Sequence, residues 1–304
     1  MTSRRNFFRL AGTAVAATAL PKMAFPEGQK QESQFRFCLN TSTISGQNPG
    51  LLKYIDIASK AGYDGVELWV RDVKAYLEAG NSAQSLRKYI ADAGLKVESA
   101  IGFAPWMTGK AGMDEMKADM LMMASIGCQR IAAPPFGVPS DKPLDLLEAG
   151  QKYRELIALG RQTGVMPLLE FWGASKVLFH LGQAMMIAAA ANDPDVRILA
   201  DVYHLFRGNS GYESLKMLRG NVIEVFHMND FVDSIPREKQ KDGDRVYPGD
   251  GAAPMKQILT DLKNMGGTKV LSLELFNETY WKQDALQVAR TGLEKMKTLV
   301  SEVE

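Results

Sequence analysis

Four side chains that can bind a metal ion each close a short apolar run in the second half of the chain. They are Glu170, Asp201, His227 and Glu274. A charged residue at the end of a buried strand costs free energy unless it is paired or binds a metal, and carboxylates that share a pocket repel one another. A divalent cation removes both costs. Three carboxylates and one imidazole suit Mn²⁺ or Mg²⁺, and Zn²⁺ or Co²⁺ also accept such ligands. We therefore expect one divalent metal ion at these four residues.

Short apolar runs rich in β-branched residues alternate with longer amphipathic runs along the chain. The predicted strands are Phe35–Asn40, Gly65–Trp69, Lys96–Ile101, Arg130–Ala133, Val165–Glu170, Val196–Asp201, Val222–His227 and Val270–Leu275. The predicted helices are Leu51–Ala61, Ala83–Ala93, Asp114–Ile126, Leu144–Thr163, Val177–Ala191, Gly211–Leu218, Ala253–Met265 and Asp284–Val300. The strands are hydrophobic throughout, as expected of parallel strands covered on both faces. The helical runs carry apolar residues at three- and four-residue steps.

This alternation predicts an α/β fold in which residues 35–304 form a single (β/α)8 TIM barrel. The alternative is an open doubly wound sheet, but Asn40–Ile44 follows the first predicted strand where a glycine-rich phosphate-binding loop is expected. In a barrel, the carboxyl ends of all strands meet at one mouth. The barrel prediction therefore brings the four candidate metal ligands together.

Further polar and aromatic residues lie near the same predicted mouth. His204 follows Asp201 by three residues and can bond a substrate hydroxyl or carbonyl. Glu67 lies near the end of the second predicted strand and is expected to contact the substrate, as is Trp69. The aromatic residues that follow strand ends are Trp69, Phe103, Trp106 and Trp172. These rings either form an apolar wall against the C–H faces of a sugar or belong to the core.

The loop after the seventh predicted strand, residues 231–251, is long and polar. Long loops in compact domains are usually functional or disordered. Arg245 lies in this loop, and its planar guanidinium suits vicinal hydroxyls or a carbonyl oxygen of a substrate. Asp230, just before the loop, either orients the His227 ring or begins the loop.

Composition excludes several functional classes. The chain has 36 Lys and Arg against 35 Asp and Glu, a net charge of +1, so no basic excess predicts a nucleic-acid partner. Two cysteines, Cys38 and Cys128, cannot form a disulfide scaffold or a zinc ribbon, and they lie in separate predicted elements. We expect both to be free buried thiols. No apolar run is long enough for a membrane span.

The first 34 residues are predicted to be an export signal and a spacer. Ser3–Phe8 contains a pair of arginines, and Leu10–Leu20 is a mild apolar run too short to cross a bilayer. The arginine pair resembles a twin-arginine signal, and Ala17–Ala19 offers a small-residue cleavage site, with Lys22–Ala24 as a second candidate. This predicts a periplasmic or otherwise extracytoplasmic protein. The alternative is a basic N-terminal helix.

Several segments resemble the xylose-isomerase-like TIM-barrel superfamily of sugar isomerases and epimerases. They are Leu169–Phe171, Asp201–His204, His227–Asp230, Asp244–Gly251 and Leu273–Phe276. Within the superfamily they look most like inosose isomerases and tagatose/psicose 3-epimerases. The resemblance spans about residues 35–300.

The resemblance implies roles for individual residues. Glu170 and Glu274 would be metal ligands and also the proton-transfer pair, and His204 would bind substrate. The epimerases place an arginine a few residues after the histidine of the seventh strand. Here Asp233 and Ser234 occupy that region, and Arg245 from the loop would take its place.

The expected function is a metal-dependent isomerase or epimerase that acts on a keto-sugar or keto-inositol through an enediolate. One alternative is a lyase or dehydratase acting on keto-polyols or 3-keto-glycosides at the same metal site. A second alternative is a non-catalytic sugar-binding barrel. The expected partner is a small sugar or cyclitol, and homo-oligomer formation stays open. Product mass separates isomerisation from elimination, and solvent deuterium incorporation separates catalysis from binding alone.

Overall fold

The computed structural model describes residues 33–304. The predicted export signal therefore lies outside the described residues. The strands of the described part are β1 (Phe35–Asn40), β2 (Gly65–Trp69), β3 (Lys96–Ile101), β4 (Arg130–Ala133), β5 (Met166–Glu170), β6 (Ile198–Asp201), β7 (Val225–Met228) and β8 (Lys269–Leu273). Its α-helices are α1 (Leu51–Ala61), α2 (Val70–Glu78), α3 (Ala83–Asp92), α4 (Lys110–Ser125), α5 (Leu146–Thr163), α6 (Leu181–Ala191), α7 (Val202–Arg207), α8 (Met255–Met265) and α9 (Ala285–Ser301).

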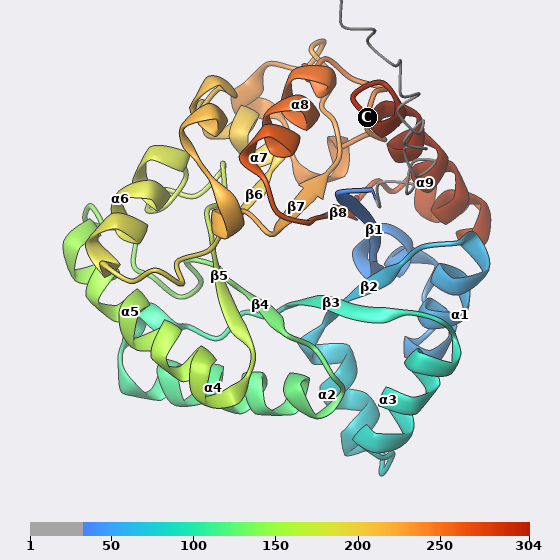
Figure 1. The fold of residues 1–304 in the computed structure, drawn as a ribbon, viewed down its shortest axis with the longest axis horizontal. Coiled ribbons are helices and arrows are strands. Elements are labelled where there is room, and N and C mark those ends of the chain that lie inside the picture. Colours follow the sequence, from blue (N-terminus) through green and yellow to red (C-terminus); the bar gives the residue numbers. More distant parts are fainter. Residues whose placement is uncertain (1–32) are drawn as a thin grey trace, which may run out of the picture. The chain divides into compact units, whose positions relative to one another are not determined.

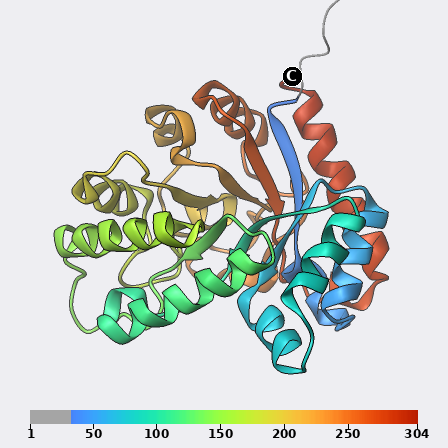
Figure 2. The same cartoon turned by 60° about the horizontal axis from the view of Figure 1, so that its bottom comes forward.

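The strands form one parallel sheet in the order β3-β2-β1-β8-β7-β6-β5-β4. The edge strands β3 and β4 lie side by side, so the sheet curls into a nearly closed ring at the centre of Figure 1. The helices surround this ring, and Figure 2 shows them on the outer faces of the strands. The predicted TIM barrel is confirmed.

Two hydrophobic layers hold the barrel together. The larger layer lies between strands and helices. The smaller layer takes one buried residue from each strand and fills the barrel interior: Cys38, Trp69, Ile101, Ala132, Leu168, Leu199, Val225 and Val270. The interior is therefore a packed core rather than a pore. Cys38 and Cys128 are buried free thiols, as predicted.

Helix ends follow local chemistry. The Asp145 side chain accepts hydrogen bonds from the backbone of Leu147 and Glu148 at the start of α5, which ends at Gly164 with a φ of 78°. The predicted helix from Val177 starts only at α6, because the His180 side chain caps that helix instead of lying within it. Within residues 33–304, no helix has the length and apolar character to cross a membrane.

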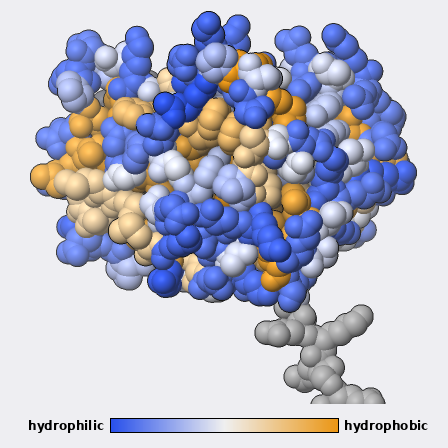
Figure 3. Space-filling model, turned by 90° about the horizontal axis from the view of Figure 1, so that it is seen from above, coloured by the Kyte–Doolittle hydropathy of each residue, from blue (hydrophilic) through white to orange (hydrophobic). Residues whose placement is uncertain are grey.

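Four elements of the structure differ from the prediction. The short helix α7 takes the place of an expected loop, and α2 was not expected at all. The predicted helix Gly211–Leu218 is only a 3-10 turn at Glu213–Met217. Strand β8 ends at Leu273, so Glu274 lies directly after it. The face of the molecule in Figure 3 carries hydrophilic side chains with hydrophobic patches between them.

Candidate metal centre and active site

Three of the four predicted ligands meet at the carboxyl ends of neighbouring strands. Asp201 of β6 is the register partner of His227 on β7, and Glu274 directly follows β8. One ligand atom from each residue lies within 4.8 Å of the others, and all three residues are buried. We call these three residues the donor cluster. The Asn229 side chain donates to Asp201 Oδ2 at 2.9 Å and so fixes this carboxylate.

The His227 ring presents Nδ1 to the two carboxylates. This nitrogen lies 3.1 Å from Glu274 Oε2 and 3.8 Å from Asp201 Oδ2. In the part of the chain that the structure describes, both ring nitrogens are buried, lie about 3 Å from a carboxylate oxygen and make no hydrogen bond of regular geometry. One imidazole nitrogen and two buried carboxylates at this spacing form a donor set for a divalent cation such as Zn²⁺ or Mn²⁺. The residues present therefore fit the metal ion expected from the sequence.

Glu67 lies behind the histidine and not in the substrate space. Its Oε2 is 3.0 Å from His227 Nε2 and also accepts hydrogen bonds from Asn40 Nδ2 and Ser272 Oγ. Burial opposes its ionisation, but the adjacent His227 outweighs burial and lowers the pKa of Glu67. The expectation that Glu67 contacts substrate is therefore corrected. Its contacts orient the ring so that Nδ1 faces the donor cluster.

Arg245 reaches the centre of the site from the loop after β7. Its guanidinium is buried, and Nη1 lies 2.9 Å from Asp201 Oδ2 and 2.8 Å from Glu274 Oε2. Nη2 pairs with Asp242 at 2.7 Å. Burial alone raises the pKa of Asp201, but the adjacent Arg245 brings it down to about 2. Arg245 thus supplies positive charge to the same oxygens that would bind the metal.

Asp230 holds this loop in place. Its carboxylate accepts hydrogen bonds from the backbone amides of Phe231, Gly249, Gly251 and Ala253. A Cβ on Gly251 would collide with the Phe231 carbonyl and the Asp230 carboxylate, so this position requires glycine. Of the two interpretations of Asp230, the structure supports the one in which it begins the loop.

His204 lies on α7 at the edge of the donor cluster. Its backbone amide donates to Asp201 Oδ1 at 2.7 Å, which caps α7 and explains a helix too short to predict. Its Nδ1 accepts from the Gly173 amide, and its Nε2 is 3.4 Å from Arg245 Nη2. Burial lowers the pKa of His204, and the Asp201 carboxylate only partly offsets this. The ring is therefore neutral near pH 7.

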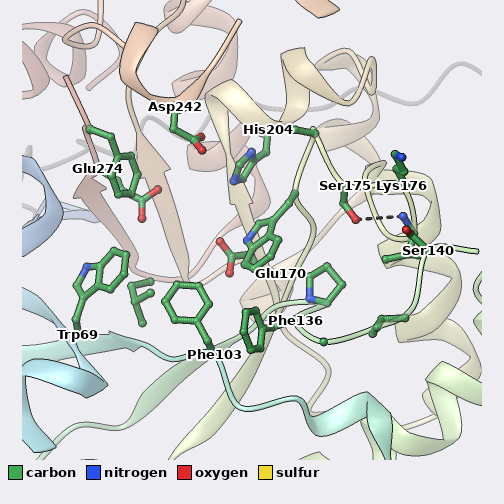
Figure 4. Close-up of a pocket in the computed structure, with 18 of the residues that line it drawn as sticks. Trp69, Phe103, Phe136, Ser140, Glu170, Ser175, Lys176, His204, Asp242 and Glu274 are labelled. Carbon is green, nitrogen blue, oxygen red and sulfur yellow. Dashed lines mark hydrogen bonds between the residues drawn. The ribbon is translucent and has the colours of Figure 1, made fainter. Parts of the chain in front are cut away.

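A cavity of about 530 Å³ opens above these residues. Glu170, Glu274, His204 and Arg245 line it, and Figure 4 shows Glu170 and Glu274 pointing into the same space. Glu170 is not one of the three residues of the donor cluster. Burial raises the pKa of Glu170 to about 8, and the carboxylates of Glu274 and Asp201 add to this rise.

The aromatic prediction holds in part. Trp69, Phe103 and Trp172 line the cavity. Trp106 does not, because it is fully buried and its ring nitrogen donates to the Pro134 carbonyl. The cavity also has lining residues that sequence reasoning missed: Phe136, Lys176, Asp242 and Phe276. Phe136 and Phe276 follow the ends of β4 and β8, so the rule that selected the other aromatic residues also applies to them.

Comparison with known proteins agrees with this geometry. A family model described as "Xylose isomerase-like TIM barrel" matches residues 55–299. An inosose isomerase from Bacillus velezensis is 28% identical over 275 residues, covering 88% of this chain and 97% of that protein. The crystal structure of the IolI protein with a binding zinc atom matches with a TM-score of 0.81 and 26% identity, over 88% of this chain and 99% of that one.

A further solved structure shows the same fold at lower identity. D-psicose 3-epimerase in the presence of D-fructose matches with a TM-score of 0.70 and 15% identity, over 87% of this chain and 99% of that one. The family model covers most of the described barrel, including all residues of the donor cluster. The chain therefore belongs to the xylose isomerase-like TIM barrel family.

Proposed function

We propose that this protein is a divalent-metal-dependent isomerase or epimerase acting on a keto-inositol or keto-sugar. One observation carries the proposal: Glu170 and Glu274 face one cavity beside a buried cluster of metal donors. Two positioned carboxylates can remove and return a proton, and a cation held by the donor cluster would stabilise negative charge that develops on the substrate. Similarity to proteins named inosose isomerase supports this substrate class.

Asp201, His227 Nδ1 and Glu274 would hold the metal, with Glu170 as the fourth ligand from the neighbouring β5 side. When bound, the ion supplies Lewis acidity that stabilises an enediolate. Similarity to the IolI protein, whose crystal structure has a binding zinc atom, supports a divalent ion here. Glu67 orients His227 behind the cluster.

The proton transfers belong to the two glutamates that reach the cavity. One removes the proton α to the substrate carbonyl, and the other returns it to another face or carbon. Both carboxylates are almost fully shielded from solvent, with 5% and 4% exposure for Glu170 and Glu274. This shielding limits the loss of the transferred proton to water. Neutral His204 lines the same cavity and can bond a substrate hydroxyl.

Deuterium exchange tests the proposal. The purified protein is analysed for metal and then incubated with an inosose or a ketohexose in deuterated water. We expect isomerised product of unchanged carbon skeleton carrying solvent deuterium. Glu274→Gln is expected to slow this by about 10²–10⁴-fold, whereas Glu278→Gln, an exposed acid four residues later, leaves the rate unchanged. Loss of water or of an aglycone would indicate a lyase, and binding without exchange would indicate a sugar-binding protein.

We also propose that residues 1–34 direct export by the twin-arginine route. The paired arginines and the mild apolar run carry this proposal. Replacing Arg4 and Arg5 by lysine is expected to retain the protein in the cytoplasm of its host, as measured by fractionation and immunoblotting. Unchanged periplasmic recovery of that variant would contradict it.

A further inference from the structure

We propose that the cavity takes a substrate with two rings. One ring, a sugar or cyclitol, lies at the donor cluster, and a second neutral ring stacks on an aromatic surface further out. This inference rests on the proposed function for the first ring only. The aromatic surface, here called the aromatic shelf, consists of Trp69, Phe103, Phe136, Trp172 and Phe276. It starts beside the donor cluster, where the Phe276 ring lies 5.1 Å from the Arg245 guanidinium carbon, and extends outward to Phe136.

The cavity is too large for one sugar ring. Its volume is about 530 Å³. A monosaccharide fills on the order of 200 Å³, or six to seven times the ~30 Å³ that each molecule occupies in liquid water. More than half of the cavity therefore stays empty when one ring is bound at the donor cluster. Pockets that enclose small ligands usually cover most of the ligand surface, so the remaining space points to a second group on the substrate.

The aromatic shelf has the geometry of a stacking surface. Phe103 is its centre, with ring centroids 5.4 Å from Trp69, 5.6 Å from Phe136 and 6.0 Å from Trp172. The rings meet at interplanar angles of 51–61° instead of stacking on one another. Edge and tilted contacts leave ring faces free for a flat partner. One face of Trp69 is covered by Arg71 at 4.1 Å, and the indole lines the cavity only with the small part of its surface that stays exposed.

Phe136 marks the outer end of the shelf. Its side chain is 44% exposed, which is high for a large apolar residue that lines a cavity. Exposed apolar surface next to a concave site gains free energy when a ligand covers it. In Figure 4, Phe136 and Phe103 lie along one side of the cavity, and Glu274, Asp242 and His204 lie on the opposite side.

The polarity of the lining residues indicates the character of the second ring. Glu170, Asp242, Glu274, His204 and Arg245 line the cavity together with the apolar side chains of Pro135, Val138 and Val177. Away from Glu274, Figure 4 shows Ser140, Ser175 and Lys176 together, so the outer part of the cavity offers two neutral hydroxyls besides the lysine. Of the lining residues within 33–304, Arg245 and Lys176 are the two cations, and Lys176 is exposed. A single exposed lysine does not make a phosphate site, which needs several donors. The outer group is therefore an uncharged ring with an apolar face.

Such a ring has two chemical sources, a second sugar or an aromatic aglycone, and binding measurements separate them. The metal-loaded full chain is titrated with methyl β-glucopyranoside, cellobiose and phenyl β-glucopyranoside by calorimetry and tryptophan fluorescence. We expect at least one two-ring probe to bind about tenfold more tightly than the methyl glucoside. Preference for cellobiose assigns a sugar, and preference for the phenyl glucoside assigns an aglycone.

Phe136→Ala tests whether the aromatic shelf causes the preference for two-ring probes. This exposed position tolerates alanine, and a melting curve confirms folding. The variant is expected to lose about tenfold in affinity for the preferred two-ring probe while the methyl glucoside affinity changes less than about twofold. Phe179→Ala is the matched control, because Phe179 is also exposed but does not line this cavity. It should keep the two-ring preference.

Equal affinities for all three probes, including no binding by any of them, overturn the inference. So does a two-ring preference that survives in Phe136→Ala. The measurement needs no turnover, so it is independent of the deuterium experiment. A two-ring preference without isomerisation would contradict the proposed function alone, and isomerisation of a one-ring ketone without any two-ring preference would contradict this inference alone.

Discussion

Replacing Arg245 by methionine tests whether the donor cluster needs added positive charge. Methionine keeps an apolar stem of similar length beside the Tyr203 ring, which lies 4.7 Å from the guanidinium carbon. It removes the Nη1 contacts of 2.9 Å and 2.8 Å to Asp201 and Glu274. Both carboxylates are almost fully buried, so water replaces the lost partner only from the cavity that Glu274 lines. The metal-free variant is therefore left with buried negative charge beside a single adjacent imidazole, that of His227.

The structure sets the size of the effect. Removing one partner of a buried ion pair typically costs about 3–5 kcal/mol. At about 2 °C per kcal/mol for a domain of this size, Arg245→Met should melt roughly 6–10 °C below the wild type in EDTA. Proton uptake by the carboxylates limits the loss and favours the lower end of this range. The measurement is thermal denaturation of the purified protein followed by circular dichroism.

Adding Mn²⁺ or Zn²⁺ separates this account from a simple packing defect. A cation held by the same carboxylates replaces the missing charge, so we expect metal to narrow the melting-temperature deficit of Arg245→Met by about half. Arg130→Met is the control, because Arg130 pairs with Glu98 and Glu224 at the opposite end of the strands. That variant should show the same deficit with and without metal.

Two results would refute the reasoning. The first is an Arg245→Met variant that melts within about 2 °C of the wild type in EDTA, since buried carboxylates would then need no guanidinium. The second is a deficit that metal leaves unchanged, as in the Arg130→Met control. The second result would mean that the cation does not bind where Arg245 contacts Asp201 and Glu274.

Two more predictions follow from buried carboxylates. Asp230→Asn removes one of the two carboxylate oxygens that accept from the loop amides of residues 231–253. We expect the free energy of unfolding, measured with denaturant, to fall by about 1–3 kcal/mol and proteolysis within that loop to become faster. Protease resistance equal to that of the wild type would contradict this. Burial, assisted by Glu115, raises the pKa of Asp119 from 3.8 to about 6. Folding thus favours its protonated form, and the stability this gives is present below about pH 4 and lost as pH rises through about 6. The free energy of unfolding of Asp119→Asn should therefore equal that of the wild type at pH 4 and exceed it by about 1 kcal/mol at pH 8, since solvent screens this partly exposed group. An equal gain in unfolding free energy at both pH values would count against this.

The strands could be predicted well because their signal is local. Each is a short apolar run, and the bounds of β1 to β4 agree with the prediction. Knowing that Asp201 and His227 end adjacent parallel strands was enough to place them together. Helices α2 and α7 were not predicted because each begins directly at the end of a strand, at residues that also form the site. α7 begins where Asp201 accepts a hydrogen bond from the His204 amide, and α2 begins directly after Trp69 without a side-chain cap.

Glu67 shows why position along a strand matters as much as residue type. Side chains alternate along a strand, so Glu67 and Trp69 both point into the barrel, but Glu67 lies two residues earlier. Two residues correspond to about 6–7 Å along a strand, which moves Glu67 one layer below the mouth. There its partner is His227 and not the substrate. Sequence reasoning counted it as near the strand end without this layer difference.

The loop after β7 and the donor cluster depend on one another physically. Burying a guanidinium as deeply as that of Arg245 costs free energy unless it pairs with anions. Asp201 and Glu274 are those anions. Conversely, the loop can bring Arg245 to the site only while Asp230 accepts hydrogen bonds from four backbone amides, three of them at the far end of the loop. A sequence motif of aspartate, arginine, proline and glycines therefore encodes no ligand by itself. It encodes a loop shape that brings one positive charge to the carboxylates of two other segments, and that long-range pairing is what local sequence patterns cannot supply.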